Sequence, residues 1–277
     1  MDFIEKKPIK RSELRLFIGK EYYTFRRYLK WCLCSKKYSK EKSGRIYPYL
    51  VFIHSTPLLR KLEGVDMHLQ YNKITNLKLA SGRINEIIIN PAEILSYWKL
   101  IGKPTYKKGY LDGLVLSADG SFKSGEAGGL CQLSNLIYWT ALHSPLTIIE
   151  RYRHSHDVFP DVNRTQPFGT GATCAYNYLD LQIENRTENK YQLIVYLTEE
   201  SLIGELRCDK EAKYRYDIYE KEHSITPGLF GGYVRNNIIY RKTYNLYNEL
   251  IKDEYITENH AYMMYAPYLE AAANRQQ

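Results

Sequence analysis

The alternation of apolar and polar positions is clearest between residues 172 and 208. In "LDLQIE" (179–184), aliphatic side chains occupy every second position, and acidic or amide side chains occupy the positions between them. This period of two is typical of a strand with one buried face and one solvated face. The runs "ATCAYNY", "YQLIVYLT" and "LIGELRC" are separated by turn residues, so the region is predicted to form an antiparallel meander.

A helical period appears over residues 130–143. Leu133, Leu136 and Ile137 recur on one side of a helical wheel. Pro145 follows and is expected to end the helix, because proline cannot continue it. The opposite side of the wheel carries a small polar stripe made of Cys131, Ser134, Asn135 and Tyr138.

Local signals predict the remaining elements. Pro91 separates two short strand-like runs, and Asp119–Gly120 is a turn signal within a hairpin over 113–125. The other expected elements are a strand over 48–59, a short helix over 75–87 with a Thr or Asn cap, a strand over 146–159 and a loop over 161–172.

Together these elements indicate an α+β fold, with an antiparallel sheet, few helices and a cysteine-bearing helix followed by strands. A chain of 277 residues suits one large domain or one domain with extensions. We expect a basic, helical N-terminal extension over 1–45, a core domain over 46–208 and a Tyr-rich extension over 209–277 that packs on the core. The last region is expected to end in a short helix over 260–274.

Composition narrows the class of protein. Apolar residues make up 44% of the chain and charged residues 25%, as in globular proteins. No run approaches the ~20 apolar residues that span a bilayer, and the N-terminus lacks the apolar core of a signal peptide. The five cysteines are odd in number and irregularly spaced, which indicates free thiols in a reducing cytoplasm rather than a disulfide framework.

Positive charge is concentrated at one end of the chain. Residues 1–45 hold 14 Lys and Arg against 5 Asp and Glu, whereas the remainder is close to neutral. The stretch "YYTFRRYLKWCLC" fits a helix that packs its aromatics on the core, peripheral contact with an anionic membrane, or nucleic-acid binding. The rest of the chain has no nucleic-acid motif, so nucleic acid is disfavoured. We therefore expect a cytoplasmic protein, with residues 1–45 as the segment that would contact the inner face of the membrane.

The first candidate for chemistry is Cys131, which opens the predicted helix directly after the glycine-rich "GEAGGL". A helix N-terminus stabilises an anion, so a cysteine there is expected to shift towards the nucleophilic thiolate. Gln132 follows and is placed to supply an oxyanion donor from its backbone or its side chain. The same residues also suit a small side chain in a tight turn or a metal ligand.

A histidine pair supplies candidate bases. His154 and His156 are two residues apart, so on a strand both would point to one face. His154 is the first choice as general base and His156 the second, and a third polar group would orient the ring. The candidate orienting residues are Asp157, Asn177 and Asp180.

Two readings without catalysis remain open. Both histidines could join Cys131 or Cys174 in a zinc site, since His-x-His on a strand is a workable chelate. Alternatively, the histidines belong to a structural network or lie at the surface. No cofactor is expected.

Four stretches together resemble the VanW family: "NLKLASGRINEIIINPAEILSYWKLIGKPT", "KKGYLDGLVL", "GGLCQLSNLIYWTALHSPLTIIERYRHSHDVFP" and "GATCAYNYLDLQIENRTENKYQLIVYL". The resemblance covers roughly residues 48–208. The family is named for an accessory member of a vancomycin-resistance cluster, and its biochemical activity is not established. Related domains occur in proteins associated with the bacterial envelope. The resemblance therefore implies cell-wall peptides or their precursors as partners.

The chain departs from the family pattern at two positions. Ala127 stands where members usually have the first of three glycines, and Gly171 stands where many have Asp. If that Asp orients the histidine, Asp180 or Asn177 would have to replace it here. The order of a helical Cys, a His on the next strand and a later Asp also resembles papain-like and transglutaminase-like enzymes.

Three hypotheses follow. The first is a cysteine-dependent amidase, peptidase or acyl-transferase, in which Cys131 is the nucleophile, His154 the base and Gln132 the oxyanion donor, with Asp180 as orienting residue. The second is a non-catalytic accessory or binding protein, in which Glu150, Arg151 and His154 form a buried polar network. The third is a zinc protein.

Overall fold

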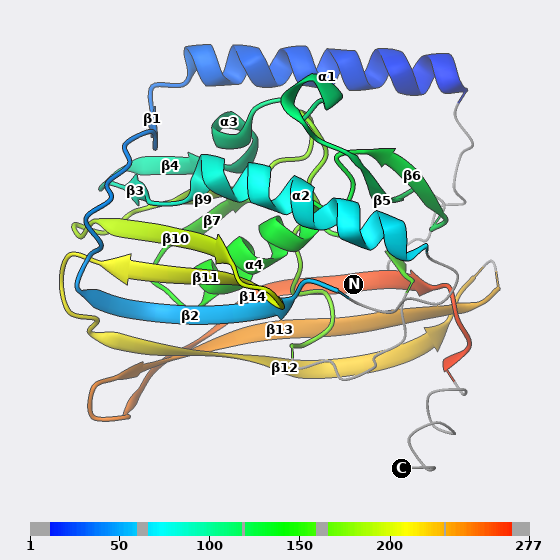
Figure 1. The fold of residues 1–277 in the computed structure, drawn as a ribbon. Helices are drawn as coiled ribbons and strands as arrows, with labels where there is room; N and C mark the ends of the chain where they lie inside the picture. The colour runs from blue at the N-terminus through cyan, green and yellow to red at the C-terminus, as the bar shows by residue number, and fades with distance from the viewer. Residues whose placement is uncertain (1–11, 60–65, 118–119, 159–165, 230, 268–277) are drawn as a thin grey trace.

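The computed structural model describes residues 12–59, 66–117, 120–158, 166–229 and 231–267 (Figure 1). The fold is α+β, as the sequence predicts, and its helices are few. The helices of the described residues are α1 (Glu13–Leu33), α2 (Met67–Ile84), α3 (Tyr97–Ile101), the 3₁₀ turn η1 (Tyr106–Lys108) and α4 (Cys131–Leu142).

Within the described parts of the chain, the strands form three larger sheets and one hairpin. The first sheet has the order β1 (Lys37–Tyr38), β4 (Glu93–Ser96), β9 (Gln182–Glu184) and β7 (Thr147–Glu150). The second has the order β2 (Tyr49–Pro57), β11 (Ser201–Cys208), β10 (Tyr191–Leu197) and β3 (Ile87–Ile89). The third has the order β12 (Tyr214–Pro227), β13 (Tyr233–Asn245), β14 (Leu250–Met263) and β8 (His156–Asp157), and the hairpin joins β5 (Asp112–Leu116) to β6 (Phe122–Glu126).

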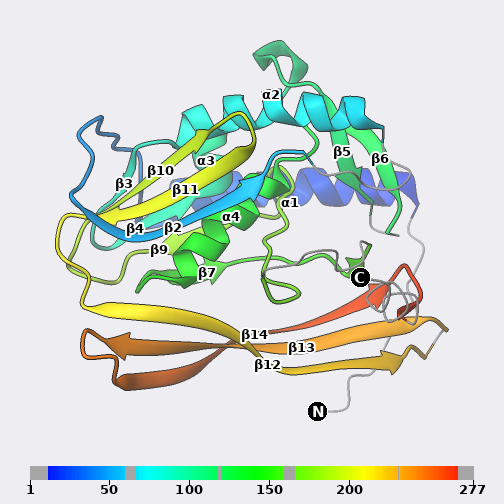
Figure 2. The ribbon, with the colours of Figure 1, turned by 60° about the horizontal axis from the view of Figure 1, so that its bottom comes forward.

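The third sheet is a separate layer that closes one side of the molecule (Figure 2). Arg241 of β13 ties this layer to the end of α4, because its guanidinium donates to the carbonyl oxygens of Leu142 at 3.2 Å and Ser144 at 2.9 Å. The helix predicted over 260–274 is wrong in its first turn. β14 continues to Met263 and pairs there with β13, while residues 268–277 lie outside the described residues.

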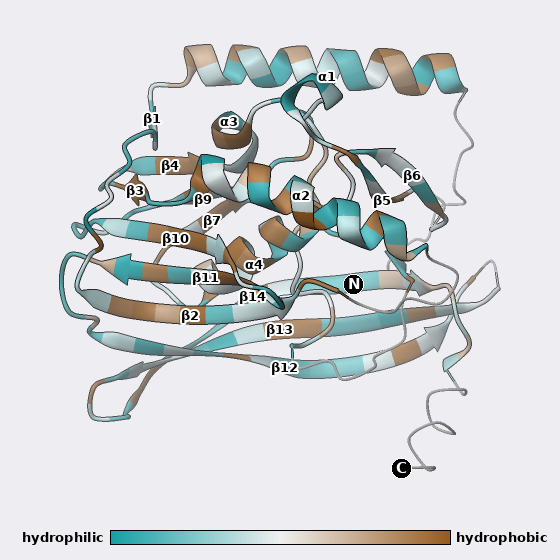
Figure 3. Cartoon of the chain, in the orientation of Figure 1, coloured by the Kyte–Doolittle hydropathy of each residue, from teal (hydrophilic) through white to brown (hydrophobic). Residues whose placement is uncertain are grey.

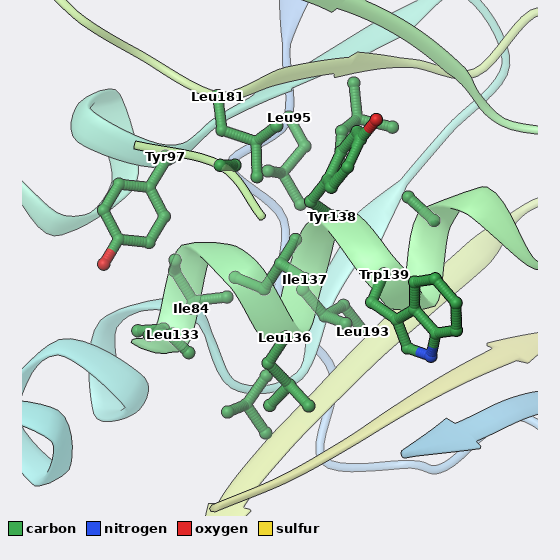
Figure 4. Packing of buried hydrophobic residues seen from close by; sticks show 14 of the residues in the cluster. Ile84, Leu95, Tyr97, Leu133, Leu136, Ile137, Tyr138, Trp139, Leu181 and Leu193 are labelled. Atoms are coloured by element: carbon green, nitrogen blue, oxygen red, sulfur yellow. The ribbon is translucent and has the colours of Figure 1, made fainter. Parts of the chain in front are cut away.

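The core is built around α4, on which hydrophobic residues predominate (Figure 3). A small apolar cavity lined by Ile137 of α4, Ile183 of β9 and Leu206 of β11 shows that the first and second sheets flank this helix. Packing is tight, since a Cβ added to Gly204 of β11 would lie 3.0 Å from the Leu136 side chain. Figure 4 shows the side chains of α4 among those of the surrounding elements.

The surroundings of α4 correct the prediction that one side of this helix is polar and the other apolar. Ser134 and Tyr138, predicted on a polar side of the helix, are buried as completely as Leu133 and Leu136. The polar stripe is therefore divided: Ser134 and Tyr138 lie inside the protein, where their polar atoms need protein partners, whereas Cys131 is half-buried and Asn135 is exposed.

Several predicted elements are confirmed: β2, the strands on either side of Pro91, the β5–β6 hairpin and α4. The helix predicted over 75–87 starts earlier and ends at Ile84. Asp66 caps its N-terminus, with a side-chain oxygen that accepts from the backbone of His68 at 2.8 Å. Thr75 and Asn76 therefore lie within the helix and do not cap it.

The predicted meander is correct for β10 and β11, which pair as an antiparallel hairpin. It is wrong for β9, which pairs with β4 and β7 in the first sheet. Gln182 and Glu184, predicted on a solvated face, are buried among polar partners: Gln182 donates to Asp180, and Glu184 accepts from Lys36 and Arg186. The strand predicted over 146–159 is divided between β7 and β8, which belong to different sheets.

Candidate functional site

The glycine-rich turn before α4 is a place of close backbone contact. A Cβ added to Gly128 would lie 2.6 Å from the backbone nitrogen of Leu114, and closer still to the carbonyl group of Gly113. Gly129 has a φ of +89°, a conformation that L side chains avoid. Asn76 of α2 joins the two segments, because its amide donates to the carbonyl oxygen of Gly128 at 3.0 Å. The glycines therefore let β5 and this turn touch.

Cys131 is the first residue of α4, as predicted. Its thiol donates to the carbonyl oxygen of Cys174 at 3.8 Å. Burial raises the pKa of the Cys131 thiol, and backbone hydrogen bonds only partly oppose this. The direction of this pKa shift is opposite to the expected shift towards thiolate, because loss of hydration disfavours the charged form.

Gln132 serves the scaffold. Its side-chain amide donates to Thr56 Oγ1 at 3.0 Å and to the carbonyl oxygen of Pro57 at 2.9 Å, which fastens the start of α4 to the end of β2. Its backbone N–H donates to the carbonyl oxygen of Gly129 at 3.1 Å. Both donors considered for an oxyanion are therefore engaged within the protein.

The polar stripe of α4 holds the segment that precedes Cys174. Ser134 Oγ donates to the carbonyl oxygen of Ala172 at 2.6 Å, and Asn135 Oδ1 accepts from the backbone of Ala172 at 2.7 Å. Gly171 lies against the same asparagine, so that a Cβ there would be 2.8 Å from Asn135 Oδ1. An aspartate at position 171 would therefore require Asn135 to move.

The two histidines do not share a strand face. β8 contains only His156 and Asp157, and His154 precedes it with an exposed side chain. The surrounding protein atoms, and then His156, lower the pKa of His154. The His156 ring lies beside Tyr262 of β14, with 6.2 Å between ring centroids. The described contacts of Cys131 include neither histidine.

The candidate orienting residues have other partners. Asp157 is buried and accepts from Arg235 at 3.3 Å and from the Tyr265 hydroxyl at 2.7 Å. Asp180 is also buried, and it accepts from Ser96 Oγ at 2.6 Å and from the backbone of Trp98 at 3.0 Å. Burial raises the pKa of Asp180, against the effect of these hydrogen bonds. Asp180 therefore braces the start of α3.

Asn177 is fully buried, and its backbone carbonyl accepts from Arg27 Nε at 3.4 Å. Its side-chain amide has no hydrogen-bond partner among the described residues. This places Asn177 beneath α1 with Arg27, and its described contacts include neither histidine.

Two arginines organise this region, and the buried network predicted from Glu150, Arg151 and His154 takes a different form, because His154 is exposed. Arg27 of α1 is 7% exposed and forms a two-pronged ion pair with Glu150 of β7. Arg151 donates to the carbonyl oxygens of Gly169 and Gly171, and its guanidinium lies 5.0 Å from the centroid of the Tyr138 ring. Glu150 and Arg151, adjacent in "ERYRHSH", thus each connect segments that are distant in sequence. The sequence signal for this role is the presence of two adjacent charged residues in an otherwise strand-like run.

The described residues lend no support to a metal site or to a membrane-spanning helix. In the part of the chain that the structure describes, no group of three or more His, Cys, Asp or Glu side chains could hold a metal ion. The zinc reading, which needs both histidines with Cys131 or Cys174, therefore lacks a ligand cluster. Within the same residues, no helix combines the length and apolar character needed to cross a membrane.

Comparisons with known proteins agree with the resemblance noted in the sequence. A family model described as "VanW like protein" matches residues 72–207. The chain is 38% identical over 181 residues to the Vancomycin B-type resistance protein VanW of Enterococcus faecalis, a match that covers 65% of this chain and 66% of that protein. It is 29% identical over 111 residues to the uncharacterized protein YoaR of Bacillus subtilis, covering 40% of this chain and 35% of that protein. No solved structure matches.

Proposed function

The chain belongs to the VanW family, and on that premise we propose that it is a non-catalytic accessory protein of glycopeptide resistance. In this proposal the glycine, cysteine and glutamine of the family signature hold the fold together, and activity resides in binding to another component. The link to resistance comes from the relative named as a vancomycin-resistance protein.

The observation that carries the proposal is the environment of the Cys131 thiol. A cysteine nucleophile needs a substantial thiolate fraction near neutral pH, which requires a pKa below the usual ~8.5. Burial moves the pKa of Cys131 in the other direction. The thiol instead donates a hydrogen bond to the Cys174 carbonyl oxygen, so the half-buried side chain acts as a small donor that joins α4 to the loop before β9.

The neighbouring residues support the same reading. Gln132 fastens α4 to β2, and Asp180 braces α3. Arg27 and Glu150 fasten α1 to β7. Each of these side chains bridges two elements that are distant in sequence, which is what a structural signature requires.

The second candidate is a cysteine-dependent amidase, peptidase or acyl-transferase that acts on peptide-like cell-wall material, with a papain-like or transglutaminase-like arrangement. It requires a histidine nitrogen within about 4 Å of the Cys131 sulfur when substrate is bound. His154 is favoured for this role by its exposed side chain and its lowered pKa, which favours the neutral ring that can accept a proton.

Alkylation of the thiol distinguishes the two candidates. The rate of iodoacetamide labelling of Cys131 would be followed by peptide mass spectrometry between about pH 6 and pH 10, with the exposed Cys32 as an internal control. We expect Cys131 to react more slowly than Cys32 across this range, and His154→Ala to leave its profile unchanged. A fast reaction near neutral pH that slows in His154→Ala would establish the enzyme instead.

A cellular assay tests the accessory role directly. In a host whose glycopeptide resistance depends on this gene, Cys131→Ser should retain the inhibitory concentration of the wild type, because serine keeps a small donor at this position. Glu150→Ala, which weakens the fold, is the matched variant expected to lower it. Purified protein would then be tested for binding of a cell-wall peptide precursor, the proposed ligand class. Loss of resistance in Cys131→Ser, with protein levels unchanged, would contradict the accessory role.

A further inference from the structure

The surface of α1 carries an unusual density of exposed apolar side chains. The exposed fraction is 68% for Leu14, 57% for Ile18, 61% for Phe25 and 43% for Leu29. Such side chains are normally scattered singly over a protein surface, and a contiguous set marks a contact surface. Figure 3 shows apolar residues recurring along α1 between polar ones.

These four residues form a stripe along one side of the helix. At 100° per residue, Leu14, Ile18, Phe25 and Leu29 fall within a sector of about 60°, while Leu16, Phe17 and Tyr23, which are also more than half exposed, lie elsewhere around the helix. Tyr22, which is 59% exposed, extends the stripe at its edge. We call these five residues the outer stripe of α1.

The rest of the protein attaches to the opposite side of α1. Arg27 is buried against Glu150 and the backbone of Asn177, and Trp31 is partly buried and packs against the hydrophobic core. The mean direction of Arg27 and Trp31 on the wheel lies about 160° from the centre of the outer stripe. The outer stripe therefore points away from the body of the protein, along the edge where α1 runs in Figure 1.

Positive charge flanks the outer stripe. Arg15 and Arg26 lie on one side of it and are exposed, whereas Lys30, further round the helix and also exposed, pairs with Glu150 of β7 at 3.5 Å. With Lys20, α1 carries four exposed cations against two exposed carboxylates, those of Glu13 and Glu21. An apolar stripe bordered by basic residues is the pattern of a helix that lies in the interface of an anionic membrane.

We propose that α1 binds the surface of an anionic membrane, lying flat with its outer stripe among the lipid headgroups and its basic flank on the phosphates. Charge favours lipid over a second copy of this chain, because two copies would bring two net-positive helices together, whereas phospholipid headgroups supply the opposite charge. The body of the protein, fastened to the opposite side of α1 by Arg27, would then be held at the surface.

Sedimentation with vesicles tests the proposal. The probes are vesicles of phosphatidylcholine alone and vesicles with about 30% phosphatidylglycerol, whose negative charge attracts basic segments. We expect the full chain to bind the anionic vesicles more tightly, and to be released at about 1 M salt, where the Debye length falls to ~3 Å. Equal binding to both vesicle types, or none to either, overturns the proposal.

Two variants separate the contributions of charge and apolar area. Arg15→Gln/Arg26→Gln should weaken binding to anionic vesicles by about 25-fold, or about 5-fold for each charge. Ile18→Asn/Phe25→Asn should weaken it by at least about tenfold through lost apolar burial. Leu246→Asn/Tyr247→Asn is the matched control, because these side chains are 71% and 86% exposed at the β13–β14 turn, and its binding should match that of the wild type. An equal loss in this control would overturn the proposal.

Light scattering tests the alternative that the outer stripe is an interface between two copies of the chain. If the wild type is a dimer that Ile18→Asn/Phe25→Asn converts to a monomer, and vesicles bind neither, the outer stripe is an interface between copies and the membrane proposal is wrong. Urea denaturation of each variant checks folding. Because the substituted side chains are exposed, the midpoints should remain close to that of the wild type.

Discussion

Replacing Gly128 by alanine tests whether the glycine-rich turn exists for close backbone contact. The added Cβ would lie 2.6 Å from the backbone nitrogen of Leu114 and nearer still to the carbonyl group of Gly113. Ordinary contacts of a Cβ begin at about 3.4 Å. No rotamer change can relieve this overlap, because both partners are backbone. The turn and β5 must therefore separate by about 1 Å.

The cost follows from what the separation disrupts. Overpacking alone costs about 1–3 kcal/mol. Asn76 bridges the two segments by donating to Gly128 and to Leu111 and by accepting from the backbone of Leu111, and each strained hydrogen bond adds about 1 kcal/mol. With the hydrogen bond from Asn76 to Gly128 strained, we expect Gly128→Ala to lower the free energy of unfolding by about 2–4 kcal/mol.

Urea denaturation measures this change. Gly82→Ala in α2 is the matched control, because a Cβ there has no atom within 4 Å. It should raise the free energy of unfolding by about 0.5–1 kcal/mol, since alanine is the better helix former. The two substitutions add the same methyl group with opposite expected signs. A Gly128→Ala protein within about 0.5 kcal/mol of the wild type would refute the close-contact explanation.

Three further predictions concern buried polar groups. Asn76→Ala should lower the free energy of unfolding by about 3 kcal/mol, because it removes three buried hydrogen bonds; faster amide exchange at Leu111 would accompany the shift in the urea midpoint. Glu150→Ala should cost about 3–5 kcal/mol by leaving Arg27 buried without its carboxylate, and the double variant Arg27→Met/Glu150→Leu should recover part of this in the same assay. Burial lowers the pKa of His143 to about 4, below ~6.5 in the unfolded chain, so the unfolded chain binds the proton more tightly. Stability should fall by up to about 3 kcal/mol as pH drops from about 6.5 to 4, and thermal melts of His143→Gln should lack this loss.

Local sequence signals correctly predicted those elements whose formation depends on residues close by in the chain. Pro145 and the leucine period bounded α4, and Asp119–Gly120 marked the β5–β6 hairpin. The start of α2 was missed because its cap, Asp66, precedes any apolar period. These successes and this failure share one cause, since each signal acts over only a few residues.

The candidate site was predictable in position but not in chemistry. Sequence placed Cys131 at a helix N-terminus, and the structure agrees. Its pKa depends on burial, which comes from residues distant along the chain, including the loop that carries Cys174. The histidine pair failed for a related reason, because the chain leaves β7 after Glu150 and enters β8 only at His156.

By itself the sequence determined the periods of the strands and helices, the turn residues, the uneven charge and the family signature, because all of these are local or additive properties. The tertiary structure decided which faces are wet. The polar side of β9 is buried among partners such as Asp180, Lys36 and Arg186, and Ser134 and Tyr138 of the polar stripe are buried because two sheets enclose α4. The apolar outer stripe of α1 is exposed because Arg27 and Trp31 attach the opposite side of that helix to the body. Burial is a relation between segments distant in sequence, so no pattern within one segment contains it.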